Sequence, residues 1–372
     1  MDDNAGSRYY QTLMNALHTL HEYIPENYST KFRNPCWYDF YQIPTSPLLQ
    51  TSKCTFQASN NLSLTNQALE QVKNSSKVYL HCLPAYFLPG FPKCATTTLH
   101  EKIIKHPLVA QTRCKECGFW TKIVNGKDTD IDKRARTLWY IDIFSQSIQV
   151  IESNPQSIML DASVTYTHSS GKMFCILPVL LMRVLPEARF ILIMRNPSER
   201  YFSHYWFITV KRSLNLQKQK KNKTKLFQYA HSREALEDFH KYTIDAIMKF
   251  QSCVDHENSA FACITKGDGG DLKYSLYYYH LIPWLGIIPR ERFLFLRTED
   301  LACDPSLTMS KVWQFLNIHD LPETESKSSN VNQVVKGLTM PPHTKTLLDA
   351  FFQPYNELLA HLLSDTRYLW NE

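Results

Sequence analysis

The segment Ala85–Leu99 constrains the fold of this chain more than any other part of the sequence. It starts with a short apolar run, continues through Gly90 and Pro92 as a tight turn, and predicts a hydroxyl-rich helix from about Thr96. Backbone N–H groups in the first turn of a helix lack intrahelical partners and carry partial positive charge. With Lys93 in the turn, the segment predicts a cradle for phosphate or sulfate.

This segment differs from the Walker A loop of nucleoside triphosphatases, which reads G-x-x-x-x-G-K-[ST]. Lys93 comes early in the turn, and no second glycine follows it before the predicted helix. A P-loop nucleotide kinase is therefore disfavoured. The alternative to a cradle is a lysine in an ordinary strand–helix turn.

A second segment, Arg189–Ser203, repeats the plan. Phe190–Met194 is a continuous apolar run, typical of a strand buried on both faces of a parallel sheet, and Arg195 stands at its end. Ligands of open α/β sheets lie beyond the carboxyl ends of the strands. We therefore expect Lys93 and Arg195 at one edge, each facing an anion. A surface ion pair between Arg195 and Glu199 is the alternative.

Strands and helices are predicted to alternate from Val78 onward, which indicates an α/β fold with a P-loop-like parallel sheet of about five strands flanked by helices. The predicted strands are Ala85–Pro89, Thr112–Lys115, Ile158–Ala162, Phe190–Arg195 and Phe293–Arg297. The predicted helices are Thr97–Ile104, Ala135–Gln146, Pro197–Val210, Ser232–Gln251, Leu272–Leu285, Pro305–Leu316 and Thr344–Leu363. Residues 1–78 are predicted as a separate irregular and helical segment, with irregular coil over Asn34–Ser52, and residues 79–372 as the main domain.

From residue 79 to its C-terminus the chain resembles the Golgi carbohydrate sulfotransferases. Pro92–Thr97 resembles their 5′-phosphosulfate loop, and Arg195 with Ser203 resembles their 3′-phosphate motif. Within the family the likeness is to N-acetylgalactosamine 4-sulfate 6-O-sulfotransferases, which act on chondroitin sulfate. The remaining similar segments are Cys82–Phe87, Lys115–Glu116, Phe119–Thr121, Leu276–Tyr277, Trp284–Leu285, Phe293–Asp300 and Gln353–Asn356.

The resemblance implies the sulfotransferase fold and 3′-phosphoadenosine 5′-phosphosulfate (PAPS) as co-substrate, with no metal required. It implies a glycosaminoglycan acceptor, with heparan sulfate as the alternative to chondroitin or dermatan sulfate. The residues predicted to bind the nucleotide are Lys93, Cys94, Ala95, Thr96, Thr97, Thr98, Arg195, Ser203 and, from a late loop, Lys336.

The catalytic residues are predicted to be Lys93 and Glu116. Sulfuryl transfer, like phosphoryl transfer, depends on positioning and on stabilising charge as it develops, and Lys93 would neutralise the departing oxygen. A sugar hydroxyl also needs a base. Glu116 follows a predicted strand, and the resembled family has a glutamate after a lysine here. The alternative is an ion pair of Glu116 with Lys115 or Lys93.

Other polar residues near the predicted strand ends have less defined roles. Asp161 and Ser163 are candidates to contact the acceptor or Lys93, and His168 is an alternative base. The chain departs from the family at Ala95, where a glycine is usual, and at Cys117–Gly118, where the family has proline and histidine. These changes keep open a catalytically silent relative that binds glycan or nucleotide.

Charge and cysteine usage bear on partners and compartment. The net charge of +6 suits an acidic glycan, and no nucleic-acid-binding motif is found. The basic run Lys211–Lys225 is interpreted as a solvated loop or as a glycan-attracting border of the site. Cys114 and Cys117 lack the second pair that a zinc site needs. The resemblance implies a Cys253–Cys263 disulfide.

The resemblance also predicts the Golgi lumen as the compartment. No secretory signal or membrane span is recognised in the sequence, whereas the resembled family usually has an N-terminal membrane anchor. We therefore expect either a fragment or a form without that anchor. Sequons such as Asn27-Tyr28-Ser29 and Asn222-Lys223-Thr224 give weak support for a glycoprotein of the secretory pathway.

Overall fold

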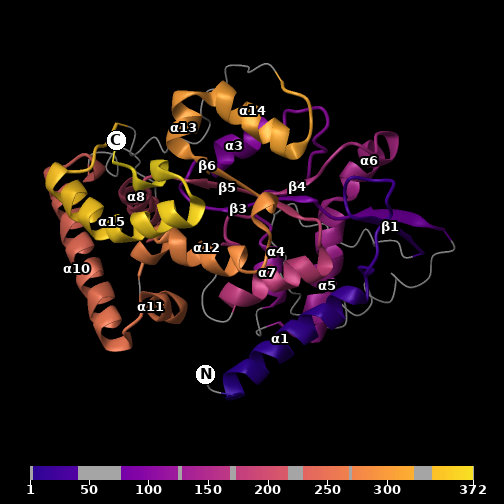
Figure 1. Cartoon of the computed structure of the whole chain (residues 1–372), viewed down its shortest axis with the longest axis horizontal. Coiled ribbons are helices and arrows are strands. Elements are labelled where there is room, and N and C mark those ends of the chain that lie inside the picture. The colour runs from indigo at the N-terminus through magenta and orange to yellow at the C-terminus, as the bar shows by residue number, and fades with distance from the viewer. Residues whose placement is uncertain are drawn as a thin grey trace.

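The central sheet has four parallel strands. The computed structural model describes residues 3–40, 77–124, 128–167, 173–216, 229–267, 270–321 and 337–371. Within these ranges the strand order is β4-β3-β5-β6, and every pairing in this sheet is parallel (Figure 1). The strands are β3 (Tyr86–Gly90), β4 (Leu160–Asp161), β5 (Arg189–Met194) and β6 (Phe293–Arg297). The α/β class predicted from the sequence is confirmed.

Strand β5 lies inside this sheet, with a strand on each side. Its residues Phe190–Met194 have no measurable solvent exposure, and it is hydrogen-bonded to β3 on one side and β6 on the other. Full burial of each such apolar side chain contributes about 1.5–3 kcal/mol. The continuous apolar run therefore specifies the middle of the sheet, where both faces are covered.

Helices cover both faces of the sheet (Figure 1). The α-helices up to β5 are α1 (Asp3–His21), α3 (Thr96–Ile103), α4 (Phe119–Ile123), α5 (Asp130–Ile143), α6 (Ile148–Ser153) and α7 (Met173–Val184). Those after β5 are α8 (Pro197–Leu216), α10 (Arg233–Glu257), α11 (Ala260–Lys266), α12 (Tyr277–Leu285), α13 (Thr298–Cys303), α14 (Pro305–Leu316) and α15 (Pro342–Leu363). None of the described helices combines the length and apolar character needed to cross a membrane.

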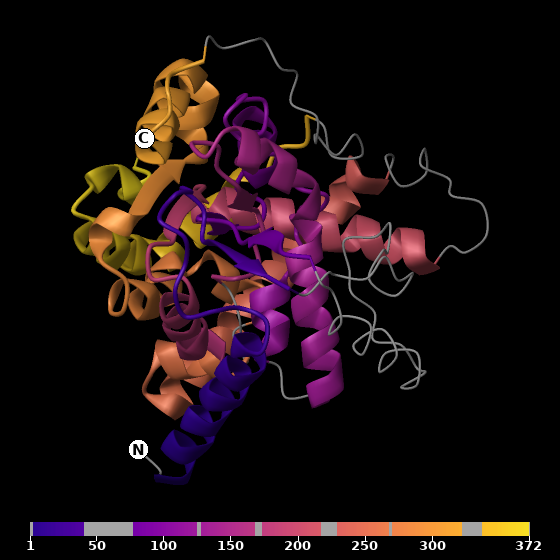
Figure 2. The same ribbon diagram turned by 90° about the vertical axis from the view of Figure 1, so that its right-hand side faces the viewer.

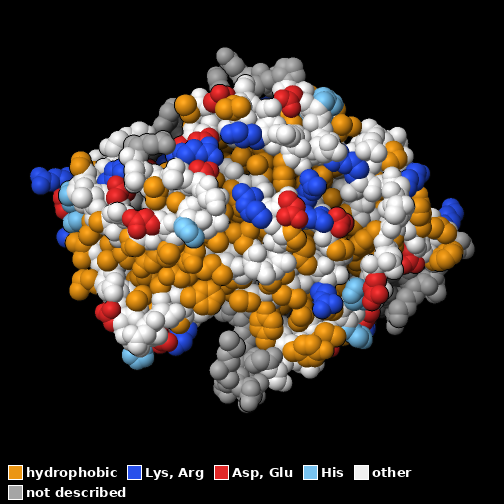
Figure 3. All heavy atoms as spheres, viewed as in Figure 1, with side chains coloured by type: hydrophobic (Ala, Val, Ile, Leu, Met, Phe, Trp, Pro, Cys, Tyr) orange, Lys and Arg blue, Asp and Glu red, His pale blue; other side chains and the backbone are white. Residues whose placement is uncertain are grey.

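The helices form two layers and a cluster at one end of the sheet. In Figure 1, α3, α13 and α14 lie above the sheet, and α12, α4 and α7 lie below it. Helix α8 packs with α15, and α10 packs with both α11 and α15, around a second hydrophobic cluster. Figure 3 shows apolar side chains gathered on the face over α10, α11 and α12, where Phe261, Tyr279 and Tyr355 pack partly buried against this cluster.

The described part of the N-terminal segment packs on the same core as the sheet. Helix α1 lies beside α5 and α7 (Figure 2), and its Leu13, Ala16 and Leu20 are buried in the central cluster. Cys36–Asp39 forms strand β1, which pairs antiparallel with β2 (Tyr79–Cys82), so the predicted irregular coil is wrong there. The boundary at residue 78 stays a prediction.

Two disulfides hold elements together. The Cys253–Cys263 bond, implied by the resemblance, joins α10 to α11 and is confirmed. A Cys36–Cys82 bond, which the sequence did not indicate, joins β1 to β2.

Thr112–Lys115 is not a strand, so the prediction of about five strands is corrected to four strands in this sheet among the described residues. The chain meets the sheet earlier, where Val109 forms an isolated parallel bridge with Ile158. The residues that follow are mostly polar, and the Arg113 side chain pairs with Asp142 of α5 instead of facing a sheet core.

The basic run Lys211–Lys225 is partly helical. Helix α8 continues through Leu216, so the predicted loop is wrong for residues 211–216. Residues 217–225 lie outside the described part of the chain. The predicted role of the run in attracting a glycan therefore stays a prediction.

Candidate functional site

The predicted cradle lies between β3 and α3. Phe91 N–H donates to the Ile193 carbonyl of β5 at 3.0 Å, which fixes the start of the turn against the neighbouring strand. Lys93 and Ala95 have φ values of 69° and 58°, a left-handed backbone uncommon for residues with a side chain. Ala95 is the N-cap of α3, and no side chain caps this end. The first-turn N–H groups of α3 are thus suited to an anion.

A tyrosine connects the cradle to the second strand–helix unit. The Tyr277 hydroxyl donates to the Arg195 carbonyl at 2.9 Å and lies 3.4 Å from Cys94 Sγ. Its ring contacts Phe91 edge-on, with centroids 4.7 Å apart. Tyr277 is buried, and its hydroxyl contacts both the turn that carries Lys93 and the turn that carries Arg195.

Three cations cluster at this edge. The Lys93 amine lies 4.4 Å from the centre of the Phe207 ring on α8, the helix that follows Arg195. Burial lowers the pKa of Lys93, and the Arg195 and Arg200 guanidinium groups lower this pKa further. The cations therefore repel one another, and a multiply charged anion placed among them would be stabilised.

Arg200 was not among the predicted site residues. It is fully buried; its Nε donates to Ser275 Oγ at 2.5 Å and its Nη2 to the Asp271 carbonyl at 3.2 Å. Its Nη1 is buried without a hydrogen-bond partner among the described residues. The sequence offered one signal, a second arginine five residues after Arg195, but nothing in the local pattern shows that this side chain is buried.

Arg195 forms the predicted alternative contact as well. Its Nη2 lies 3.1 Å from Glu199 Oε2, one helical turn on, and both side chains are about a third exposed. Exposed pairs of this kind contribute little, about 0–1 kcal/mol. The pair therefore leaves Arg195 available to a phosphate.

The other predicted nucleotide-binding residues occupy the same elements. Thr96, Thr97 and Thr98 form the first turn of α3, and Ser203 lies partly exposed on α8. Burial raises the pKa of the Cys94 thiol to about 11, and its side chain is turned into the core. Lys336 and His168 lie outside the described residues.

Glu116 lies near Lys93 but in an ion pair with Lys115. Its carboxylate is 2.5 Å from the Lys115 amine, and its side chain is half exposed. The pKa of Lys93, lowered chiefly by burial, is pulled upward by the Glu116 carboxylate, so the two groups are close enough to interact. The structure thus contains the alternative pairing of Glu116 with Lys115, and the role of Glu116 as base stays a prediction.

Asp161 is buried beneath the Glu116 loop. Its side-chain oxygens accept hydrogen bonds from the hydroxyl groups of Ser163, Tyr140 and Tyr166 at 2.6, 2.8 and 2.9 Å, and Cys117 Sγ approaches at 3.6 Å. Burial raises the pKa of this carboxyl group, and the surrounding hydrogen bonds oppose that rise.

This network sets the path of the loop. Ser163 Oγ accepts from the Gly118 N–H at 3.1 Å, and Glu116 N–H donates to the Ala162 carbonyl at 3.1 Å. Asp161 and Ser163, predicted as candidate acceptor contacts, are buried and contact Cys117 and Gly118, the two residues after Glu116. No group of three or more metal-ligating side chains occurs among the described residues, and neither Cys114 nor Cys117 forms a disulfide there.

Sequence comparisons with known proteins point to one family. The Sulfotransferase domain family matches residues 83–340. The chain is 27% identical to human carbohydrate sulfotransferase 15, covering 93% of this chain and 66% of that relative. It is 25% identical to the membrane-associated sulfotransferase kil1 of Dictyostelium discoideum, covering 77% and 66%. A solved sulfotransferase from Alicyclobacillus acidocaldarius shares 18% identity with a TM-score of 0.47, covering 76% of this chain and 96% of that one.

Proposed function

The chain belongs to the sulfotransferase family, and we propose that it transfers the sulfuryl group of PAPS to a sugar hydroxyl of a glycosaminoglycan. The observation that carries the proposal is the placement of Lys93 and Arg195 beyond the ends of adjacent parallel strands, joined through the Tyr277 hydroxyl. Two cations that follow neighbouring strands suit a nucleotide with phosphate groups at both ends. The mutual repulsion of Lys93, Arg195 and Arg200 supports the same ligand.

The nucleotide would bind across the two strand–helix units. The 5′-phosphosulfate would accept hydrogen bonds from the first turn of α3 and from Thr96, Thr97 and Thr98. The 3′-phosphate would bind the Arg195 guanidinium, whose planar fork matches a phosphate, and the Ser203 hydroxyl on α8. Cys94 and Ala95 would contribute backbone only, and Lys336 stays a proposed contact from a later segment.

Lys93 and Glu116 would carry the transfer step. The sulfuryl group passes from the bridging oxygen of the nucleotide to the acceptor oxygen, and the acceptor proton passes to a base. Lys93 would stabilise the charge left on the departing phosphate oxygen. Glu116 would take the proton, released from its exposed pair with Lys115 when the acceptor binds.

For the acceptor we propose the 6-hydroxyl of N-acetylgalactosamine 4-sulfate in chondroitin or dermatan sulfate. Similarity to a carbohydrate sulfotransferase over 93% of the chain supports a glycan acceptor, and heparan sulfate is the alternative. The chain spans 66% of the length of that relative, so its activity and partners are proposals for this chain. The Golgi lumen is the proposed compartment, supported by the Cys36–Cys82 and Cys253–Cys263 disulfides, which form in oxidising compartments.

The test is transfer of label from PAPS to chondroitin, dermatan and heparan sulfate acceptors. Lys93→Ala is expected to lower the transfer rate at least about 100-fold, as loss of a group that stabilises developing charge does. Glu116→Gln is expected to lower it about 100-fold or more while nucleotide affinity is kept. Lys105→Ala and Glu152→Gln remove exposed charges outside the proposed site and serve as matched controls.

Two results would contradict the proposal. Full transfer activity in Lys93→Ala would exclude the assigned role of the cradle lysine. Nucleotide binding by the parent chain without transfer to any acceptor would favour the silent relative, which the changes at Ala95 and Cys117–Gly118 keep open.

A further inference from the structure

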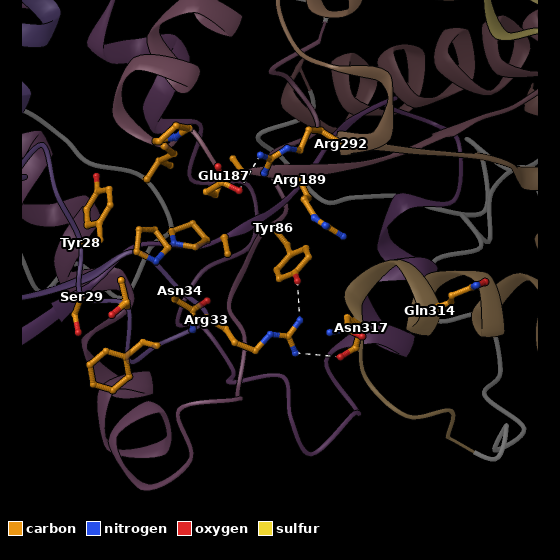
Figure 4. A pocket seen from close by; sticks show the side chains of 18 residues that line it. Tyr28, Ser29, Arg33, Asn34, Tyr86, Glu187, Arg189, Arg292, Gln314 and Asn317 are labelled. Carbon is orange, nitrogen blue, oxygen red and sulfur yellow. Dashed lines mark hydrogen bonds and ion pairs between the residues drawn. The ribbon is translucent and has the colours of Figure 1, made fainter.

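We propose that a cavity where the parallel strands begin binds an acidic sugar unit of the glycan. The proposed transfer site lies beyond the other ends of the same strands. The proposal rests on the glycan acceptor proposed above. The cavity has a volume of about 560 Å³ and includes Tyr86 and Arg189, the first residues of β3 and β5 (Figure 4). Lys93 and Arg195 follow the other ends of these strands. With 6 residues in β5, the two sites are roughly 20 Å apart.

The N-terminal segment builds one wall of this cavity. Tyr28–Thr30 and Phe32–Pro35 line it, and the Cys36–Cys82 disulfide holds the end of this segment to the strand that precedes Pro84 and Tyr86. The cavity is therefore a product of tertiary packing.

Arg33 fixes this wall to the domain. Its Nη2 donates to the Leu316 carbonyl at 2.5 Å. Its Nη2 also donates to the Tyr86 hydroxyl at 2.8 Å, and its Nη1 donates to the Asn317 carbonyl at 3.2 Å (Figure 4). These carbonyls end α14, where the helix dipole favours a cation. We therefore assign Arg33 to holding the wall.

Arg189 and Arg292 are the groups that would bind the ligand. Within the described part of the chain, the Arg189 side chain makes one hydrogen bond, from Nη1 to the Phe315 carbonyl at 3.3 Å, whereas a guanidinium group has five N–H donors. Arg292 pairs with Glu187 at 2.7 Å; its side chain is 20% exposed and that of Glu187 is 85% exposed. The pair is thus an inner guanidinium and an outer carboxylate at the rim.

The Glu187 carboxylate shows where an acidic group of a ligand would be held. Its pairing with Arg292 is solvent-exposed, and exposed ion pairs are weak enough for a ligand carboxylate or sulfate to replace them. Arg292 and Arg189 both line the same cavity, so one acidic sugar could engage both guanidinium groups (Figure 4).

The chemistry of the lining favours an acidic pyranose. Three arginines and one glutamate line the cavity, which gives it a net positive charge. Planar guanidinium forks match carboxylates and sulfate esters. Tyrosine and proline rings, Tyr28, Tyr86, Pro84 and Pro186, supply apolar walls for the C–H faces of a sugar ring. The volume lies within the range of small-molecule sites, about 300–1,000 Å³.

Calorimetric titration of the full chain with a chondroitin sulfate hexasaccharide, with the nucleotide site saturated with 3′-phosphoadenosine 5′-phosphate, tests the proposal. Arg189→Ala and Arg292→Ala are each expected to weaken the cavity binding event about tenfold, as expected for loss of a charge-assisted hydrogen bond. Arg290→Ala, which removes a nearby arginine outside the cavity, should leave it unchanged. Glu187→Gln should tighten binding, because it removes the competing carboxylate.

A hyaluronan hexasaccharide, which has carboxylates and no sulfate, shows which acidic group the cavity recognises. Arginine-dependent binding of both oligosaccharides assigns the site to the uronate, and binding of chondroitin sulfate alone assigns it to the sulfate ester. Identical titrations for the parent, Arg189→Ala and Arg292→Ala, or no binding by the parent, would overturn the proposal. Urea unfolding of each variant checks that it is folded. The Glu187→Gln variant keeps every arginine of the cavity, so its result does not depend on whether the arginine variants fold.

Failure of this inference and failure of the proposed function give different results. If the parent transfers sulfate while the arginine variants keep its affinity and its KM for the polymer, the cavity assignment fails and the function stands. If the parent transfers nothing but binds in an Arg189-dependent way, the cavity stands and the function fails. If both the cavity assignment and the proposed function hold, the arginine variants should show a raised KM for the polymer and an unchanged kcat.

Discussion

Tyr140→Phe should destabilise the domain because the Tyr140 hydroxyl serves two buried partners. It donates to Asp161 at 2.8 Å and accepts from Trp120 Nε1 at 3.0 Å. A hydrogen bond to a charged group contributes about 1.5–3 kcal/mol, and leaving the buried indole N–H unpaired costs about 1–3 kcal/mol. The free energy of unfolding should therefore fall by about 4 kcal/mol, measured by urea unfolding followed through tryptophan fluorescence.

A double-mutant cycle isolates the part of this loss in unfolding free energy that comes from the hydrogen bond to Asp161. Asp161→Asn removes the charge but retains one oxygen acceptor, and hydrogen bonds to ionised groups are roughly twice as strong as neutral ones. Tyr140→Phe should then cost about 1 kcal/mol less in a chain that already carries Asp161→Asn than in the parent. Transfer should fall in both single variants, because the network holds Gly118 and the Glu116 loop.

Tyr10→Phe is the matched control, since the Tyr10 side chain is exposed and its hydroxyl should contribute little to stability. If the Tyr140 and Asp161 substitutions add to within about 0.5 kcal/mol, the two groups are uncoupled and the reasoning is refuted. A cost of Tyr140→Phe no greater than that of Tyr10→Phe would refute it more directly.

Three further predictions concern the cradle and the second core. Because burial, Arg195 and Arg200 lower the pKa of Lys93, a bound anion should raise this pKa again. Nucleotide binding in alkaline buffer should therefore take up protons. This uptake is measured as a binding heat that depends on the buffer, and Lys93→Arg should abolish it. A Cβ at Gly90 would lie 2.2 Å from Thr167 Oγ1, so Gly90→Ala should abolish nucleotide binding and Thr167→Ala should partly restore it. Replacing both cysteines of the Cys253–Cys263 bond should cost about 3 kcal/mol of unfolding free energy and leave kcat unchanged, measured by urea unfolding and transfer assays.

Local pattern sufficed for most secondary structure. Pro305–Leu316 was predicted with the bounds it has, and the predicted strands near Ala85, Phe190 and Phe293 differ from the observed ones by a residue or less at each end. Helix α10 runs to Glu257, past the predicted end, because its last turns keep an apolar face toward the second core. The error at Thr112–Lys115 arose because strand pairing depends on a neighbour that the local sequence does not identify.

The sequence alone determined that two strand–turn–helix units each have a cation between strand and helix. Apolar runs, turn residues and helix starts are local patterns of neighbouring residues. Tertiary structure decided what those cations meet. The pairing of β3 with β5 makes them neighbours, the Tyr277 hydroxyl joins their turns, and the burial of Arg200 adds a third charge. The cavity at the other edge likewise exists only because residues far apart in the chain pack together, and long-range packing leaves no local periodicity to read.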